Sequence, residues 1–430
     1  MIKIYRGSAD ALKRTDDDVE RDDKIRESVS AIIADVRARG DAALYDYALK
    51  FDKAELSAIE VSAEEIERAV SECDEKLTAV MKRAAENIRA FHSRQVREPF
   101  VIKDKPGVVM GQKITPIEKV GLYVPGGTAA YPSSVLMNCI PAKIAGCSEI
   151  VMVSPPSRGG DISPVILAAA KIAGVDRVFR VGGAQAIAAL AYGTETVPKV
   201  DKIVGPGNAF VAEAKRQVFG KVAIDMIAGP SEILVISDGN SDPSVLAADL
   251  LSQAEHDRMA TAIFLTTSEE LAGKVSEELE RQIPALPRRD IARESIDVNG
   301  KIIILESIDE CIKLANEMAP EHLELCVEEP FNYLDAIKNA GSIFLGRNCP
   351  EALGDYMAGP NHTLPTSGTA RFSSPLSVDD FVKKSQFTYF TAEALGELCG
   401  DVASFARAEG LEAHARSALA RREKGVFENE

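Results

Sequence analysis

Three features are missing from this sequence: C-x-x-C pairs, apolar segments long enough to cross a membrane, and an apolar signal core after Met1. The 7 cysteines are scattered along 430 residues, which argues against a disulfide framework and against a thiolate zinc site. The first residues run directly into charged sequence. Together these absences predict a protein of the reducing cytoplasm.

Basic residues are outnumbered: 50 Lys and Arg stand against 66 Asp and Glu, a formal net charge of −16. Such an acidic surface repels phosphate backbones and anionic lipids, so nucleic acid and membrane surfaces are poor partners. A negatively charged cofactor would need local donors, such as backbone N–H groups at helix starts. The length, with 46% apolar residues, predicts two or three globular units.

The order of apolar runs predicts an α/β fold. Residues 20–95 repeat apolar side chains at helical spacing and carry a capping-box pattern at Ser62 and Glu65. From about Val120, short apolar runs alternate with glycine turns and alanine-rich helices, and the alternation resumes after Gly229. Such alternation is typical of doubly wound parallel sheets. The tail from Val378 is predicted to be mostly helical.

Histidine is scarce, and a neutral imidazole is both a common metal ligand and a base near neutral pH. The histidines are His92, His256, His322, His362 and His414. Gln253 and His256 stand three residues apart at the end of a predicted helix, so their side chains share a face and could hold one ion. The alternative is a solvated polar helix end.

Glu321 and His322 follow Ala319-Pro320, which predicts a helix start. A carboxylate beside an imidazole could provide two proton acceptors. The alternative is a capping glutamate beside an exposed histidine.

Residues 346–377 are rich in Gly, Pro, Asn and Ser and are predicted to form a long irregular loop. This loop contains Asp355 and His362, so it could bring a carboxylate to a metal, although turn chemistry alone also accounts for the composition. Glu409 and His414 lie further on in the predicted helical tail, where a single histidine is usually only solvated.

Two glycine turns follow predicted strands and open predicted helices. Gly205-Pro206-Gly207-Asn208 has Phe210 where the third glycine of a dinucleotide fingerprint belongs, so it is not that fingerprint. Residues 182–185 form the second turn. Both turns could offer backbone donors to a nucleotide, or they could be tight turns without a ligand. Cys139 and Cys147 are predicted to be buried structural cysteines rather than nucleophiles.

Seven segments, in chain order, together strongly resemble histidinol dehydrogenases, and the resemblance extends over nearly the whole chain, from the N-terminal helices to His414. The residues that carry the resemblance are Leu122 to Gly127 with Ser133, Asn138, Pro141, Ala142, Gly146 and Cys147; Gly182 to Ala189; Gly205 to Asn208; Ala228 to Glu232; Ser252 to Asp257; Glu321 to Glu324; and Gly359 to Thr366.

The resemblance implies a zinc-dependent, NAD-linked enzyme that oxidises L-histidinol to L-histidine through L-histidinaldehyde, the final step of histidine biosynthesis. His322 would accept the alcohol proton, and Glu321 would activate the water that hydrates the aldehyde. One Zn²⁺ per subunit would orient the substrate's imidazole and amino nitrogens. Its ligands would be Gln253, His256, Asp355 and His414.

Other roles follow from the same resemblance. Tyr123, Gln185 and Asn208 would contact NAD. The protein would be a homodimer in which Glu409 and His414 reach the neighbour's site. The substrate would touch the zinc ligands and also Ser231, His322, His362 and Glu409.

The implied architecture is two incomplete Rossmann-like domains with small helical extensions. Residues 21–119 and 230–377 would form the first domain, with most metal and substrate residues. Residues 120–229 would form an inserted NAD-binding domain. Residues 1–20 would be an N-terminal extension, and residues 378–430 a C-terminal helical domain that reaches the partner subunit.

Two other functions fit parts of the pattern. A zinc hydrolase would use Glu321 as a general base on metal-bound water, but the glycine turns at residues 182 and 205 would then have no role. A nucleotide- or metal-binding regulatory module predicts that Glu321→Gln changes no activity or affinity.

Overall fold

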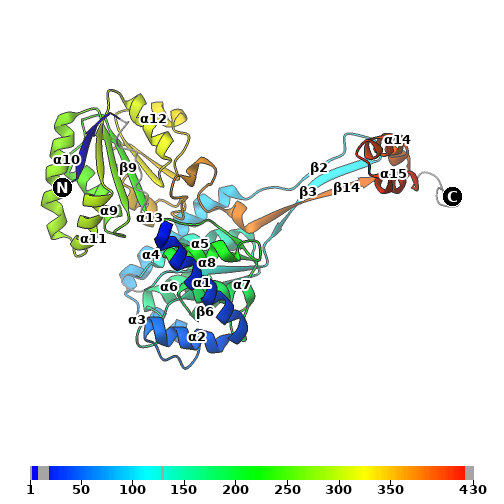
Figure 1. Cartoon of the computed structure of the whole chain (residues 1–430), viewed down its shortest axis with the longest axis horizontal. Coiled ribbons are helices and arrows are strands. Elements are labelled where there is room, and N and C mark those ends of the chain that lie inside the picture. The colour runs from blue at the N-terminus through cyan, green and yellow to red at the C-terminus, as the bar shows by residue number, and fades with distance from the viewer. Residues whose placement is uncertain (1, 8–18, 127–129, 422–430) are drawn as a thin grey trace. The chain divides into compact units, whose positions relative to one another are not determined.

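The chain forms two compact units, whose helices and strands are labelled in Figure 1. The computed structural model describes residues 2–7, 19–126 and 130–421; Gly127 and residues 8–18 and 422–430 lie outside the described residues. The first unit comprises Met1–Val96 and Ile117–Phe381, and the second comprises Arg97–Pro116 and Val382–Glu430. Both sheets of the first unit are parallel, which confirms the predicted α/β class.

One parallel sheet of the first unit has the strand order β6-β5-β4-β7-β8. Helices α5 to α8 alternate with its strands along the chain, as predicted. Because the strand order reverses between β4 and β7, a topological switch point lies there. The elements are β4 (Lys119–Tyr123), α5 (Pro132–Ala145), β5 (Glu149–Ser154), α6 (Pro164–Ala173), β6 (Arg177–Arg180), α7 (Gly183–Tyr192), β7 (Lys202–Val204), α8 (Ala209–Val218) and β8 (Ala223–Ile224).

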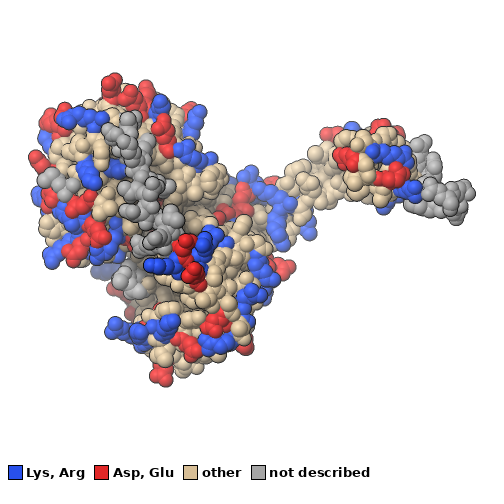
Figure 2. All heavy atoms as spheres, in the orientation of Figure 1, with Lys and Arg blue, Asp and Glu red and all other residues tan. Residues whose placement is uncertain are grey.

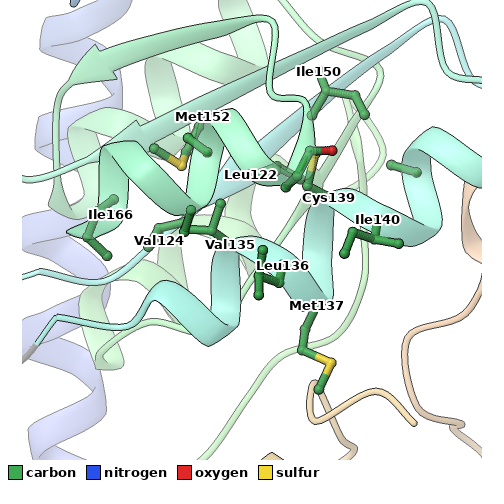
Figure 3. Packing of buried hydrophobic residues seen from close by; sticks show 14 of the residues in the cluster. Leu122, Val124, Val135, Leu136, Met137, Cys139, Ile140, Ile150, Met152 and Ile166 are labelled. Atoms are coloured by element: carbon green, nitrogen blue, oxygen red, sulfur yellow. The ribbon is translucent and has the colours of Figure 1, made fainter. Parts of the chain in front are cut away.

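Apolar side chains fill both faces of this sheet. In β5, Ile150 and Met152 pack on one face, while Val151 and Val153 pack on the other. Figure 3 shows the first of these faces, where side chains of α5 lie against those of β4 and β5. A strand covered on both sides is almost continuously apolar, which is why these strands were easy to predict from the sequence.

The N-terminal helices cover the same five-stranded sheet. Helices α1 and α2 pack beside α7, and α3 and α4 pack beside α5 and α6. The structure differs here from the predicted domains, which grouped residues 21–119 with residues 230–377. Helical periodicity shows which face of a helix is apolar but not which sheet covers it. The elements are α1 (Val19–Arg39), α2 (Asp41–Tyr47), a π-helical turn (Ala48–Asp52), α3 (Ala63–Glu72) and α4 (Glu75–His92).

The second parallel sheet of the first unit has the order β1-β11-β10-β9-β12-β13, so its switch point lies between β9 and β12. Strand β1 pairs with β11 at one edge, so residues 3–6 of the predicted helical N-terminal extension form a strand, while its last two residues begin α1. The elements are β1 (Lys3–Arg6), β9 (Glu232–Ser237), α9 (Pro243–Ala254), β10 (Thr261–Thr266), α10 (Glu269–Gln282), α11 (Arg289–Val298), β11 (Lys301–Ile304), α12 (Ile308–Met318), β12 (His322–Cys326) and β13 (Ser342–Leu345).

The predicted irregular loop at residues 346–377 is partly helical, because it contains the short helix α13 (Glu351–Tyr356) and a 3₁₀ turn (Thr369–Arg371). Pro350 precedes the helix at its N-cap. Because Asp355 lies within α13, its carboxylate is held by a helix and not by an irregular loop.

The second unit joins three antiparallel strands, in the order β14-β3-β2, to two helices. The helices of the predicted helical tail are confirmed, but a nine-residue strand, β14, precedes them. Most β14 side chains are exposed within this unit, so its residues lack the clear apolar alternation that predicts a strand. The elements are β2 (Phe100–Ile102), β3 (Val108–Pro116), β14 (Val382–Phe390), α14 (Ala392–Ala408) and α15 (Glu412–Leu419).

Acidic and basic side chains are interspersed over the visible face of the sheet-bearing unit in Figure 2. The excess of acidic residues therefore does not form one continuous patch on this face. Among the described residues, no helix combines enough length with enough apolar character to span a bilayer.

Candidate active site

The amino ends of β9 and β12 lie next to each other at the switch point of the six-stranded sheet, where His322 pairs with Ile233. Helices α9 and α12 end at the same edge of the sheet, because each one leads into a strand of this parallel sheet. A helix C-terminus carries partial negative charge. This edge therefore favours cations.

His322 begins strand β12, whereas the sequence predicts a helix start here. Helix α12 ends at Met318, Ala319 turns the chain with a left-handed φ of 51°, and Pro320 follows. Every residue of β12 is buried, and the strand lies between β9 and β13. Five consecutive buried residues suit a strand covered on both faces.

The hydrogen bonding of His322 fixes its tautomer. Nδ1 lies 2.9 Å from the carbonyl oxygen of Glu232, and a carbonyl only accepts, so the neutral ring carries its hydrogen on Nδ1. Nε2 is buried and has no hydrogen-bond partner among the described residues. The lone pair of Nε2 is therefore available to accept a proton.

Glu321 forms a reciprocal contact with Glu232. Its Oε2 accepts from the Glu232 N–H at 2.9 Å, and its own N–H donates to Glu232 Oε2 at 3.3 Å. Burial raises the pKa of Glu321 to about 8. A carboxyl group that titrates near neutral pH is suited to general acid–base work.

Gln253 and His256 lie at the end of α9, as predicted. Gln253 is buried in the last turn, and the His256 N–H donates to the Gln253 carbonyl at 3.0 Å. Burial lowers the pKa of His256, which favours the neutral imidazole that binds metals.

Asp355 lies one turn after Glu351 on α13. Its Oδ1 is 3.6 Å from Nδ1 of His362. Burial would raise the pKa of Asp355, but His362, together with His322 and His256, outweighs burial and lowers it to about 2. Asp355 is therefore an anionic group near several imidazoles.

His362 lies in a loop anchored on both sides. Asn361 donates through Nδ2 to the Met137 carbonyl at 2.7 Å, and Thr363 Oγ1 donates to Asn138 Oδ1 at 3.1 Å. Both anchoring residues are buried. Two buried anchors hold His362 beside α13 with little conformational freedom.

His322, Glu351 and Asp355 offer ligand atoms that all lie within 4.8 Å of one another. Glu351 Oε1 and His322 Nε2 are 3.8 Å apart, and both atoms are buried without hydrogen-bond partners in the described part of the chain. Imidazole and carboxylate donors suit a divalent ion such as zinc, so the side chains fit a metal. Glu351 was not predicted from the sequence; its only signal was the four-residue spacing from Asp355, which places both on one helical face.

The residues that the resemblance assigns to the cofactor lie at the carboxyl edge of the five-stranded sheet, whereas the metal cluster lies at the amino edge of the six-stranded sheet. Tyr123 ends β4, and its hydroxyl accepts from the Gly183 N–H at 3.1 Å. Burial raises the pKa of Tyr123 to about 12. Gln185 is buried in the first turn of α7, so it lies near the same helix start.

The turn from β7 to α8 lies directly against the end of β4. Gly205 has a φ of 116°, and a Cβ atom there would overlap the Tyr123 carbonyl oxygen. Asn208 caps α8 by accepting from the backbone N–H groups of Phe210 and Val211, which leaves its amide nitrogen for another partner.

A buried ion pair supports this turn. Lys215 donates to the Gly205 carbonyl at 3.0 Å and pairs with Asp225, and both side chains are almost fully buried. Asp225 also accepts from the Gly205 N–H at 2.7 Å. Neither residue was predicted from the sequence, because the two lie on different segments and no local sequence pattern joins them.

The cysteines near α5 are buried and free, as predicted. Burial raises the pKa of Cys139 to about 12 and that of Cys147 to about 11. A thiol with such a pKa is a poor nucleophile at neutral pH.

Of the other predicted residues, Ser231 directly precedes β9, and its carbonyl accepts from the Thr261 N–H at 2.9 Å. This places Ser231 at the same sheet edge as His322. Glu409 and His414 belong to the second unit, so their predicted place beside zinc and substrate stays a prediction.

Parallel α/β sheets with buried imidazoles and carboxylates grouped at a strand switch point define an α/β enzyme. The sequence model of the family described as histidinol dehydrogenase matches residues 15–422. The histidinol dehydrogenase of Clostridium acetobutylicum is 56% identical over 96% of this chain and 97% of its own length. That of Geobacter sulfurreducens is 56% identical over 92% of each chain.

A solved structure shows the same likeness. The crystal structure of histidinol dehydrogenase from Elizabethkingia anophelis matches with a TM-score of 0.90 and 40% identity, covering 98% of both chains. The chain belongs to the histidinol dehydrogenase family and is an oxidoreductase.

Proposed function

We propose that this chain oxidises L-histidinol to L-histidine through L-histidinaldehyde, using zinc and NAD. The observation that carries the proposal is Nε2 of His322, a buried base with no partner among the described residues. It lies within reach of carboxylates from α13 and next to a glutamate whose pKa is raised. These groups match the two proton acceptors that the oxidation requires.

Gln253, His256 and Asp355 would hold the zinc, and the partner subunit's His414 would be the fourth ligand. The fit rests on the neutral His256, the anionic Asp355 and the cation-favouring helix ends at this edge. When bound, zinc would fix the imidazole and amino nitrogens of the substrate while NAD accepts hydride.

His322 acts in the first oxidation. Its Nε2 accepts the hydroxyl proton of the alcohol while hydride leaves the same carbon, giving the aldehyde. The Glu232 carbonyl keeps the ring oriented through Nδ1–H. Because both ring nitrogens then carry hydrogen, the nearby carboxylates stabilise the imidazolium.

Glu321 acts in the second oxidation. Its carboxylate takes a proton from the water that adds to the aldehyde carbon. The hydrate then loses a second hydride and becomes the carboxylate of L-histidine. The raised pKa of Glu321 makes its ionised form a stronger base than an ordinary carboxylate.

Tyr123, Gln185 and Asn208 would contact NAD at the carboxyl edge of the five-stranded sheet. Ligands bind at such switch points, and the N-termini of α7 and α8 offer backbone donors to a pyrophosphate. A cavity of about 400 Å³ lies at the carboxyl end of β5, lined in part by Ser154, Pro155 and Asp161. The cavity provides room for part of a dinucleotide beside the turn at Gly182.

Ser231, His362 and Glu409 would complete the substrate contacts, with Glu409 contributed across a homodimer. Ser231 and His362 lie on segments that border the metal cluster. The homodimer and the cytoplasmic location remain predictions.

The first experiment counts NADH produced per L-histidinol by the full chain, before and after removal of metal with a chelator. We expect two NADH per substrate, loss of the reaction on chelation, and recovery with Zn²⁺. One NADH per substrate with accumulated aldehyde would contradict the four-electron reaction. No NADH from zinc-loaded protein would contradict the substrate assignment.

A further inference from the structure

The carboxylate of Glu232 accepts from two backbone N–H groups that belong to different segments. Its Oε2 accepts from the Glu321 N–H at 3.3 Å, and its Oε1 accepts from the Ser367 N–H at 3.0 Å. Glu232 begins β9, whereas Ser367 follows His362 in residues 346–377. One side chain therefore joins the start of a strand, the predicted base Glu321 and the segment that carries His362.

Glu321 lies one residue before the pairing of β9 with β12 begins, at Ile233 and His322. Its carbonyl accepts from the N–H of Ser342, the first residue of β13, at 2.9 Å. Its N–H donates to the carboxylate of Glu232, a side chain of β9. A side-chain carboxylate thus takes the place of a strand backbone as the acceptor for this N–H group.

The contact between the two glutamates is reciprocal and therefore reaches the side chain of Glu321. Glu321 Oε2 accepts from the Glu232 N–H at 2.9 Å, and Glu321 is buried. His322 is held differently, because its Nδ1 donates to the backbone carbonyl of Glu232, and every substitution of Glu232 keeps that carbonyl. Loss of the Glu232 carboxylate should therefore disturb Glu321 more than His322.

We propose that Glu232 is a positioning residue whose carboxylate holds Glu321 in place for the second oxidation. The inference rests on the proposed function, in which Glu321 activates the water that adds to the aldehyde. Loss of the carboxylate should then slow the oxidation of L-histidinaldehyde more than that of L-histidinol, since a misplacement of about 1 Å can cost about 10²-fold in rate. The rival role is electrostatic: the charge of Glu232, and not its hydrogen bonds, would act on Glu321.

Three substitutions separate the two roles. Glu232→Met removes both oxygen acceptors. Glu232→Asp keeps the charge but withdraws both oxygens by one methylene. Glu232→Gln loses the charge but keeps one oxygen acceptor at the same reach, so it can serve one of the two N–H groups. Glu149→Met is the matched control, because Glu149 also begins a buried strand, β5, and pairs with Lys119 at 2.8 Å in the other sheet.

The measurement is the rate of the first NADH formed in a single turnover of the full-length, zinc-loaded protein, started from L-histidinol or from L-histidinaldehyde. If Glu232 positions Glu321, the aldehyde rate falls about 10- to 100-fold in Glu232→Met and Glu232→Asp, while the alcohol rate stays close to that of the wild type. Glu232→Gln should lose less than Glu232→Met. A loss in Glu232→Gln as large as that in Glu232→Met, with a wild-type ratio of the two rates in Glu232→Asp, would overturn the proposal in favour of the charge.

A second readout does not depend on turnover. The Glu321 N–H loses its acceptor in Glu232→Met, so we expect its amide hydrogen to exchange faster in the metal-free protein. Glu149→Met should change neither this exchange nor the ratio of the two rates. Unchanged exchange at Glu321 in Glu232→Met would overturn the proposal. If Glu232→Met does not fold, Glu232→Asp decides by the same two readouts.

Glu321→Gln distinguishes failure of this inference from failure of the proposed function. We expect it to slow aldehyde oxidation at least as much as Glu232→Met does. An unchanged aldehyde rate in Glu321→Gln would refute the proposed role of Glu321 itself. A slow aldehyde rate in Glu321→Gln, with a wild-type ratio of the two rates in Glu232→Met and Glu232→Asp, would refute only the positioning role.

Discussion

The two parallel sheets of the first unit each have a strand switch point but carry their candidate sites at opposite edges. In the five-stranded sheet, Tyr123 and Asn208 lie at the carboxyl ends of strands, where α7 and α8 begin. In the six-stranded sheet, His322 and Gln253 lie at the amino edge, where α9 and α12 end. Both sites lie near a switch point, and the edge of the sheet is what differs.

Electrostatics shows why the edge matters. Helix N-termini offer unpaired N–H groups and partial positive charge, which suit a pyrophosphate. Helix C-termini offer partial negative charge, which suits a cation. A strand order alone therefore does not predict which ligand a Rossmann-like half binds; the direction of the adjoining helices must be known as well.

Replacing the base at the amino edge should have the largest effect. His322→Asn removes Nε2 as a proton acceptor, and we expect the rate of NADH formation from L-histidinol to fall by about 10²- to 10⁴-fold. Zinc and NAD affinities should stay close to those of the wild type. Initial rates, together with titrations of zinc and NAD, test this separation; an equally large loss of NAD affinity would show that the two edges are not independent sites.

The sequence allowed much of the fold to be predicted, because strands covered on both faces are nearly continuous apolar runs. Val151 and Val153 alternate with Ile150 and Met152 across two cores, and such a run between glycine turns favours a buried strand. The alternation of strands and helices then predicted parallel sheets. The sheet that the N-terminal helices cover was not predictable, since an apolar helix face fits either sheet.

A pair of site residues could be predicted from the sequence only when its two members lie close together in the chain. Gln253 and His256 share one helix end, so their spacing carries the signal. Glu321 and His322 were correctly predicted to be a carboxylate and an imidazole side by side. They were predicted at a helix start, whereas His322 begins strand β12, because a proline such as Pro320 can precede a strand as well as a helix. Glu351 was missed because its partners come from separate segments, and no local pattern records such contacts.

The next largest effect is expected from a substitution of Gly205, which lies at the carboxyl edge of the five-stranded sheet. In Gly205→Ala, the added Cβ meets the Tyr123 carbonyl and the backbone retains a φ of 116°. We expect a loss of about 3 kcal/mol in the free energy of unfolding and weaker NAD binding. Urea unfolding and NAD titration measure the two effects.

Gly220→Ala is the matched control for this substitution. Gly220 also has a positive φ, of 94°, but no described atom lies within 4 Å of the added Cβ. It should lose only about 1 kcal/mol, with unchanged NAD affinity. Equal losses in the two variants would mean that backbone conformation, not the close approach to β4, sets the cost at Gly205.

The last prediction concerns pH and centres on Glu321 at the amino edge. The pKa of Glu321 is raised from 4.5 to about 8 by burial, so the folded state binds a proton that the unfolded state has lost between these values. Its contribution to stability is complete below pH 4.5 and is lost as the pH rises through about 8, by at most about 1.4 kcal/mol per pH unit.

Urea unfolding of the metal-free protein between about pH 5 and 8 measures this dependence, and Glu321→Gln should make the slope shallower because the amide does not titrate. Tyr123→Phe is the control at the carboxyl edge. Since burial raises the pKa of Tyr123 to about 12, its loss should leave the slope in this range unchanged. The slope that remains in Glu321→Gln belongs to the other buried carboxyls whose pKa values burial raises: Asp249 and Asp52 to about 6, and Glu324 to about 9. An unchanged slope in Glu321→Gln would assign the proton to these groups alone.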